Sequence, residues 1–291
     1  MPNYNSPFLS RAIQSVVKQT HQEWELILVD NFSENFPERI VNQFNDNRIH
    51  FYKFNNNNNI AKGRNFGIKK TKFEWIAFLD SDDVWDKDKL LKVAETINKN
   101  SSDLIYHGMY YLPKKFGFFQ HKIDHQSSEL KKPIYETLIK EGNGIANSSV
   151  VARKSLLEKI NFLSEDERKY SWEDYDCWIR YSKITDNFLF IPDILGFCWV
   201  GGGNISNLDQ TYINYKNFHK IYRKQIFDLT KKKRLDWYKK FLLVWYFKKK
   251  KVYRAYLLQK KITPNDLNSF LRLILIKIIF FSKIIKKFTK I

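Results

Sequence analysis

Phe78-Leu79-Asp80-Ser81-Asp82-Asp83 joins an apolar run, residues 75–79, to three closely spaced carboxylates. A short apolar run bounded by polar residues predicts a buried strand. Carboxylates crowded at a strand end repel one another unless a cation lies among them. Oxygen ligands of this kind suit Mg²⁺ or Mn²⁺, together with the oxygens of a diphosphate. A second interpretation stays open: Ser81 or Asp82 could cap a helix that begins near residue 86.

Strand-like and helix-like segments alternate on both sides of this stretch. The predicted strands are residues 24–29, 49–54, 75–79 and 104–110, and the predicted helices are 6–20, 36–45, 61–70, 86–99 and 173–182. Residues 147–160 repeat the strand-then-helix pattern, whereas 111–145 look less regular. The alternation predicts an α/β fold with a mostly parallel sheet covered by helices. Ligands bind beyond the carboxyl ends of strands in such sheets, and Asp30 and Asp80 both fall there.

Asp30 and Arg64 are candidate contacts to a nucleotide. Asp30 directly follows the apolar residues 26–29 and could accept hydrogen bonds from a base or ribose, or it could close a turn through Ser33. Arg64 stands near the start of the predicted helix 61–70, where a cation and free backbone N–H groups suit a phosphate. An ordinary solvated basic face is the alternative for Arg64.

A carboxylate pair, Glu173-Asp174, begins the predicted helix 173–182. The helix dipole would keep a carboxylate ionised there, so that it could take a proton from a hydroxyl group. The alternative is a capping box from Ser171 to Asp174, although Glu or Gln is the usual fourth residue. Each motif thus has a structural alternative, and only the order of the motifs along the chain favours a common function.

Composition places the chain among globular proteins, because 43% of its 291 residues are hydrophobic. Cys177 and Cys198 cannot build a disulfide framework and lack metal-ligand spacing, which fits a reducing cytoplasm. The polar residues 1–5 show none of the apolar character of a secretory signal.

The positive charge is concentrated at the end of the chain. Residues 211–291 carry 23 Lys and Arg against 3 Asp and Glu, while residues 1–210 carry 27 against 28. On a helix over 270–291, one face would hold Arg272, Lys283, Lys286, Lys287 and Lys290. The apolar remainder predicts a helix lying in an anionic membrane surface, and the charges argue against a transmembrane helix. The alternatives are a helix packed on the rest of the chain and a nucleic-acid interface, for which no binding motif is found.

Taken in order, the motifs resemble glycosyltransferase family 2, whose members have the GT-A fold, a Rossmann-like mixed sheet flanked by helices. The resemblance covers residues 2–206 and rests on Pro2-Asn3-Tyr4-Asn5, Val29-Asp30-Asn31-Phe32-Ser33, Gly63-Arg64-Asn65-Phe66-Gly67, the acidic stretch and Trp172-Glu173-Asp174-Tyr175-Asp176. It implies an inverting, metal-dependent enzyme. Such an enzyme would move a hexose or N-acetylhexosamine, usually from a UDP-sugar, to a glycan or lipid-linked glycan in surface-polysaccharide synthesis.

The resemblance also implies a role for each candidate residue. Asp174 would be the general base, with Glu173 as the second choice, and Asp82 would bind Mn²⁺ or Mg²⁺. The implied nucleotide contacts are Tyr4, Asn5, Asp30 for the base, Arg64, and Asp80 for the ribose. The enzyme would be cytoplasmic and peripheral on the inner face of the cytoplasmic membrane, with no nucleic acid as a partner.

The expected division is a catalytic domain over 1–210, with a nucleotide-binding half (1–100) and an acceptor half (101–210), followed by a basic helical region, 211–291. Two departures from the family pattern stand out. The apolar strand that usually precedes Pro2 is not seen, so the fold is expected to lack its first strand. The Arg-x-His often found in this region is Trp199-Val200-Gly201 here, which puts contacts to the diphosphate in doubt. A nucleotide-sugar-binding protein with impaired catalysis is therefore the alternative function.

Overall fold

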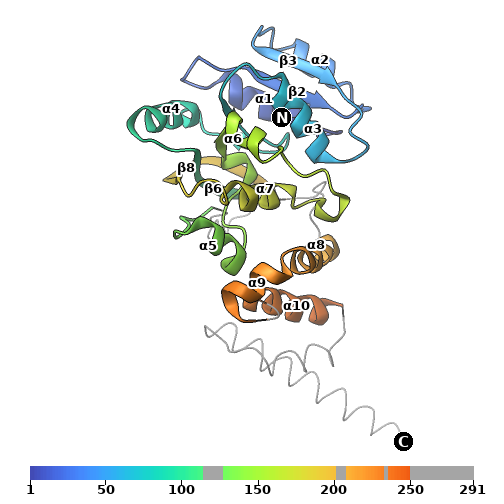
Figure 1. Cartoon of the computed structure of the whole chain (residues 1–291). Coiled ribbons are helices and arrows are strands. Elements are labelled where there is room, and N and C mark those ends of the chain that lie inside the picture. Colours follow the sequence, from blue (N-terminus) through green and yellow to red (C-terminus); the bar gives the residue numbers. More distant parts are fainter. Residues whose placement is uncertain (114–126, 201–207, 233–234, 250–291) are drawn as a thin grey trace, which may run out of the picture. The chain divides into compact units, whose positions relative to one another are not determined.

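A computed structural model describes residues 1–113, 127–200, 208–232 and 235–249 (Figure 1). The chain divides into two compact units, Met1–Ile205 and Ser206–Ile291. The membrane-surface helix predicted over 270–291 lies outside the described residues. Within the part of the chain that is described, no helix has both the length and the apolar character needed to cross a bilayer.

The first unit contains a small parallel sheet with the order β1-β2-β3. Its strands are β1 (Pro2–Asn3), β2 (Leu26–Asp30) and β3 (Ile49–Lys53). Asn3 pairs with Asp30, and the Met1 carbonyl accepts a hydrogen bond from the Val29 N–H at 2.9 Å. Although the first strand was expected to be lacking, Pro2 and Asn3 form a two-residue strand that pairs with the end of β2.

A second, mixed sheet has the order β4-β7-β6-β8-β5. Its strands are β4 (Trp75–Ala77), β5 (Val84–Trp85), β6 (Leu104–Pro113), β7 (Val151–Arg153) and β8 (Phe188–Val200). Only β6 and β8 run parallel, and the other three pairs are antiparallel. The mostly parallel sheet predicted from the alternation is found for β1–β3 only. The second sheet is mixed, as the GT-A resemblance implied, since the short strands β5 and β7 run against their longer neighbours.

Helices of the first unit cover these sheets (Figure 1). They are α1 (Leu9–Val17), α2 (Pro37–Asn42), α3 (Ile60–Lys70), α4 (Lys89–Lys99), α5 (Ile134–Glu141), α6 (Lys154–Lys159) and α7 (Glu173–Tyr181). The helix predicted over residues 6–20 is confirmed as α1, in which Leu9 and Ile13 are fully buried and pack with Leu28 and Leu79 in one core. Helix α5 falls within the segment expected to be irregular.

The second unit contains α8 (Leu208–Ile221), α9 (Arg223–Thr230) and α10 (Asp236–Lys248). Aromatic rings join α8 to α10: Tyr212 stacks on Trp245, and His219 stacks on Tyr238, each with 4.1 Å between ring centroids. The Trp245 indole N–H also donates to the Asp209 carboxylate at 3.0 Å. The aromatic residues between the lysines of this stretch thus help to hold these helices together.

Candidate active site

The acidic stretch 80–83 forms the loop between β4 and β5, and neighbouring elements hold its backbone. The Asp80 N–H donates to Ser148 Oγ at 3.0 Å, from the 3-10 helix η1 (Asn147–Ser149). Ser6 Oγ donates to the Ser81 carbonyl at 2.9 Å, and Arg11 Nη2 donates to the Asp82 carbonyl at 2.7 Å. Helix α4 begins at Lys89 and has no side-chain cap, so capping by Ser81 or Asp82 is wrong.

Arg64 of α3 is the central cation of the site. Its side chain is 5% exposed, which contradicts the solvated basic face considered from the sequence. Nη2 donates to Asp80 Oδ1 at 2.6 Å, and Nη1 donates to Glu173 Oε1. Burial disfavours the charge, yet these two carboxylates raise the pKa of Arg64 above its usual value. Arg64 therefore joins the end of β4 to the start of α7.

Four carboxylates interact electrostatically with Arg64: Asp80, Asp82, Glu173 and Asp174. Asp80 Oδ1 also accepts from Asn147 Nδ2 at 3.2 Å. Burial, helped by Asp80, raises the pKa of Asp82 to about 6. Burial, and to a smaller extent the neighbouring charge of Glu173, raises the pKa of Asp174 to about 7. Such crowding of carboxylates is what a bound cation would relieve.

Asp83 belongs to the structure of the loop. Its Oδ1 accepts from the Trp199 N–H at 3.0 Å, which ties the loop to the end of β8. Burial, and to a smaller extent the charge of Asp80, raises the pKa of Asp83 to about 7. Since Asp83 is 7% exposed and Asp82 is more open, Asp82 is the carboxylate better placed to meet a ligand.

Glu173 and Asp174 begin α7 as predicted. The N-cap is Trp172, which makes no side-chain cap hydrogen bond, so Ser171 does not stand at the N-cap position that the predicted capping box would give it. Glu173 is 5% exposed and bound to Arg64, whereas Asp174 is partly exposed. The structure therefore favours Asp174 over Glu173 as a carboxylate that could reach a substrate.

Asp30 lies at the end of β2 and is fully buried. Its Oδ1 accepts from Asn3 Nδ2 at 2.7 Å and from Ser33 Oγ at 2.5 Å, and its Oδ2 accepts from the Ser33 N–H at 2.8 Å. The turn considered as an alternative is therefore present. Because Asp30 is fully buried, a direct contact with a base would require neighbouring residues to move, so that role stays a prediction.

Tyr4 and Asn5 follow β1 at the same edge as Asp30. The Tyr4 side chain is 59% exposed, which leaves it available to a ligand. Asn5 Oδ1 accepts from the Glu34 N–H at 2.8 Å, and the Asn5 N–H donates to Ser33 Oγ at 2.7 Å. Asn5 thus holds the loop after β2, and its predicted contact to the nucleotide stays a prediction.

Several residues of the site were not predicted from the sequence. They are Asn3, Arg11, Asn147 and Ser148, and each acts on a partner far away along the chain. The Asn147–Asp80 pair is separated by 67 residues. No local periodicity or spacing marks such a partner, and only the fold brings it to the acidic loop.

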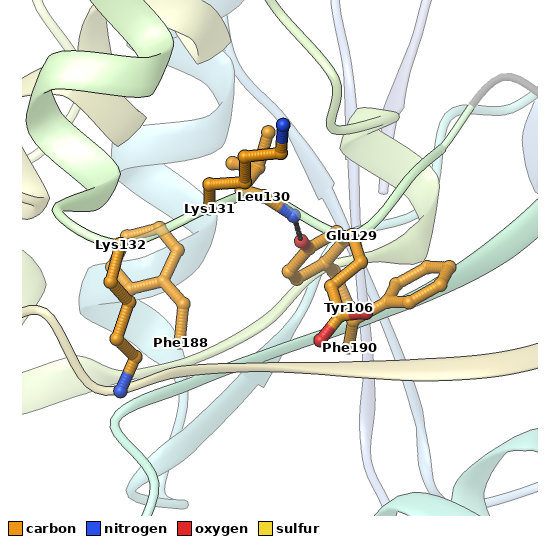
Figure 2. Close-up of a pocket in the computed structure, with 7 residues that line it drawn as sticks. All are labelled: Tyr106, Glu129, Leu130, Lys131, Lys132, Phe188 and Phe190. Atoms are coloured by element: carbon orange, nitrogen blue, oxygen red, sulfur yellow. Dashed lines mark hydrogen bonds between the residues drawn. The ribbon is translucent and has the colours of Figure 1, made fainter.

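A separate pocket of about 490 Å³ opens beside β6 and β8 (Figure 2). It is lined by Tyr106, Glu129, Leu130, Lys131, Lys132, Phe188 and Phe190. Phe188 and Phe190 lie at the start of β8, whereas Trp199, which bonds to the acidic loop, lies near the end of that strand. The pocket shares no residue with the acidic site.

With this geometry in place, the chain can be compared with known proteins. The family model described as glycosyl transferase family 2 matches residues 1–160, more than half of the chain. The chain belongs to this family, and its first unit has the GT-A fold.

Two relatives and one solved structure give the range of similarity. The putative teichuronic acid biosynthesis glycosyltransferase TuaG of Bacillus subtilis (strain 168) is 36% identical over 37% of this chain and 44% of TuaG. WfgD of Escherichia coli, a UDP-Glc:alpha-D-GlcNAc-diphosphoundecaprenol beta-1,3-glucosyltransferase, is 32% identical over 64% of this chain and 69% of WfgD. The crystal structure of S. aureus TarS 1-349 with UDP-GlcNAc aligns with a TM-score of 0.60, at 18% identity, over 94% of this chain and 77% of that chain. The matched region is thus less than half of TuaG.

Members of this family usually use a divalent metal, so the site should offer oxygen ligands for one. Among the described residues no group of three or more His, Cys, Asp or Glu side chains could hold a metal ion. Mg²⁺ is, however, commonly bound by one or two carboxylates plus substrate phosphates. Asp82, with Asp80 beside it, fits that second kind of site.

We predict that Arg64→Met lowers the free energy of unfolding by about 3–5 kcal/mol, because it leaves a buried carboxylate without its partner. Chemical denaturation of the purified protein measures this loss. Arg168→Met is the control, since Arg168 forms an exposed pair with Asp166 and its loss should change stability little. Arg64→Met/Glu173→Leu removes both charges of the Arg64–Glu173 pair, so the loss of unfolding free energy should be smaller than in Arg64→Met alone. A double variant as unstable as the sum of the two single variants would contradict the bridge.

Proposed function

We propose that this protein is an inverting, metal-dependent glycosyltransferase that uses a nucleotide-sugar donor. The observation that carries the proposal is the Arg64 bridge. It holds Asp80 and Glu173 and so brings the acidic loop and the start of α7 into one site. Asp82 and Asp174, the two carboxylates to which we assign different tasks, both interact electrostatically with the Arg64 guanidinium. Membership of glycosyltransferase family 2 supports the same activity.

Asp82 would hold Mn²⁺ or Mg²⁺, with the diphosphate supplying further oxygens. When bound, the metal would neutralise charge on the leaving diphosphate. Asp80 keeps Oδ2 without a hydrogen bond among the described residues, because Arg64 and Asn147 both use Oδ1. We assign that oxygen to a ribose hydroxyl, and the exposed Tyr4 ring to the base.

The proposed reaction is a single displacement at the anomeric carbon. Asp174 takes the proton of an acceptor hydroxyl while that oxygen forms its bond to the carbon. The bond between the same carbon and the diphosphate oxygen breaks, and the diphosphate leaves with the electron pair. One displacement inverts the configuration, and no covalent bond to the protein is formed.

The names of the similar proteins guide the choice of substrates. TarS was crystallised with UDP-GlcNAc, and the name of WfgD gives UDP-Glc as donor and a diphosphoundecaprenol-linked sugar as acceptor. We therefore propose a UDP-linked hexose or N-acetylhexosamine as donor. The proposed acceptor is a glycan or lipid-linked glycan of surface-polysaccharide synthesis, the process named for TuaG.

We predict that transfer from UDP-Glc or UDP-GlcNAc to a diphospholipid-linked acceptor requires Mn²⁺ or Mg²⁺ and falls at least a hundredfold in Asp82→Asn. Released UDP and glycosylated lipid are measured with metal and with EDTA. Asp86→Asn is the control, because Asp86 lies beyond β5 in the turn before α4. Transfer by Asp82→Asn at the rate of the unchanged protein would refute the metal site. Donor binding without any transfer would favour the impaired protein instead.

We predict that kcat/KM for transfer rises with pH until about pH 7 and then levels off. With a pKa of about 7, Asp174 is protonated below that pH and cannot accept a proton, and it is charged above it. Asp174→Asn should lower the rate about a hundredfold or more and remove this limb of the pH profile. Initial rates between pH 5.5 and 8.5 measure both effects. A profile that keeps its rise in Asp174→Asn would assign the base to another residue.

Association with an anionic membrane surface would suit a lipid-linked acceptor, and it would place the enzyme on the inner face of the cytoplasmic membrane. The support is the charge of residues 211–291, with 23 Lys and Arg against 3 Asp and Glu. Much of that charge lies in residues 250–291, outside the described residues, so this part of the proposal rests on the sequence pattern alone.

We predict that the full chain floats with vesicles containing anionic phosphatidylglycerol and not with neutral phosphatidylcholine vesicles. Lys286→Gln should weaken binding about fivefold, because a lysine near such a surface contributes about 1 kcal/mol. Lys277→Gln removes the same charge away from the predicted basic face and should not weaken binding. Protein that stays at the bottom with both kinds of vesicle would refute the membrane proposal.

A further inference from the structure

Arg11 of α1 is a second arginine that contacts the acidic loop. Its Nη2 donates to the Asp82 carbonyl at 2.7 Å. Its guanidinium lies 4.5 Å from the centre of the Phe8 ring and 5.6 Å from that of Trp199. Phe8 and Trp199 pack with 4.6 Å between their centroids. Two aromatic rings thus fix the orientation of a cation beside Asp82.

The hydrogen-bonding capacity of Arg11 is not filled by the described residues. A guanidinium has five N–H donors, and the Asp82 carbonyl takes one of them. Nε is buried and has no partner. Arg11 is therefore a partly unpaired cation next to the proposed metal ligand.

The other cation of the site cannot easily serve an anionic ligand. Arg64 gives its Nη1 and Nη2 donors to Glu173 and Asp80, and releasing either would leave a carboxylate unpaired. The end of β8, where the family often carries Arg-x-His, has Trp199 in this chain. A diphosphate that arrives at Asp82 therefore needs a cation from another element.

We propose that Arg11 binds the diphosphate of the donor beside the metal and stabilises it as the leaving group. This inference rests on the proposed function. The planar guanidinium matches two phosphate oxygens at once, and its stacking on Phe8 and Trp199 holds it ready. Arg11 stays protonated throughout: the electron pair of the broken bond goes to the diphosphate, and the acceptor proton goes to Asp174.

The same contacts would also suit a purely structural tie between α1 and the loop. The two roles differ in what they do to nucleotide binding. A structural tie would change the binding of every nucleotide alike, whereas a diphosphate contact favours UDP over UMP. The comparison of these two probes therefore separates the roles.

Calorimetric binding of UDP and UMP in the presence of Mn²⁺ tests the proposal on the full chain. Arg11→Met should weaken UDP binding about ten- to a hundredfold, since a hydrogen bond to a charged group contributes about one to two factors of ten in affinity. The same substitution should change UMP binding less than about twofold. Arg11→Lys keeps the charge but not the paired donors and should lie between. Arg153→Met is the matched control, because Arg153 lies 4.6 Å from the Trp75 ring and donates to the Ser102 carbonyl.

Each outcome has a distinct meaning. Equal weakening of UDP and UMP, or no change in either, overturns the role of Arg11 and leaves the proposed function standing. If the unchanged protein binds neither UDP nor UMP, the proposed function fails, and the inference fails with it. Thermal unfolding of each variant shows whether it is folded. If Arg11→Met is not folded, the UDP and UMP affinities of Arg11→Lys decide the role of Arg11.

Discussion

The site depends on one buried ion bridge, in which Arg64 holds Asp80 and Glu173. Arg64 and Glu173 are separated by 109 residues, and both side chains are almost fully buried. Charges in such a place are costly unless they are paired. The bridge therefore fixes the end of β4 against the start of α7. The bridge can form only when α3, the end of β4 and the start of α7 lie together.

This pairing also divides the carboxylates between structure and chemistry. Glu173 is used by Arg64, and Asp83 is used by the Trp199 N–H. Asp82 and Asp174 remain as carboxylates with raised pKa values in a partly buried site. A raised pKa suits a group that gains a cation or accepts a proton during a reaction. The bridge thus explains why neighbouring acidic residues would have different tasks.

Much of the fold and part of the site could be predicted from the sequence. The apolar periodicity of α1 and the apolar run before Asp80 are local patterns, and the structure bears out both elements. Strand β8 was missed because Pro192 and Asp193 interrupt its apolar pattern, although it lies between β6 and β5 in the sheet.

Partners distant along the chain could not be predicted in this way. The sequence left a phosphate contact and a solvated basic face open for Arg64, because nothing near it in sequence shows its two carboxylate partners. The turn of Asp30 to Ser33 was considered from the sequence, but the bond from Asn3 was not, because Asn3 is 27 residues away. Hydrogen bonds of this kind depend on the tertiary fold, so local spacing carries no information about them.

A crystal structure of the protein with UDP and Mn²⁺ tests the central claim most directly. We expect Arg64 to keep its bonds to Asp80 and Glu173, the metal to bind Asp82 and the diphosphate, and Asp174 to face the open side of the site. An Arg64 that leaves Glu173 to bind the diphosphate, or a metal bound away from Asp82, would contradict the claim that the Arg64 bridge organises this site.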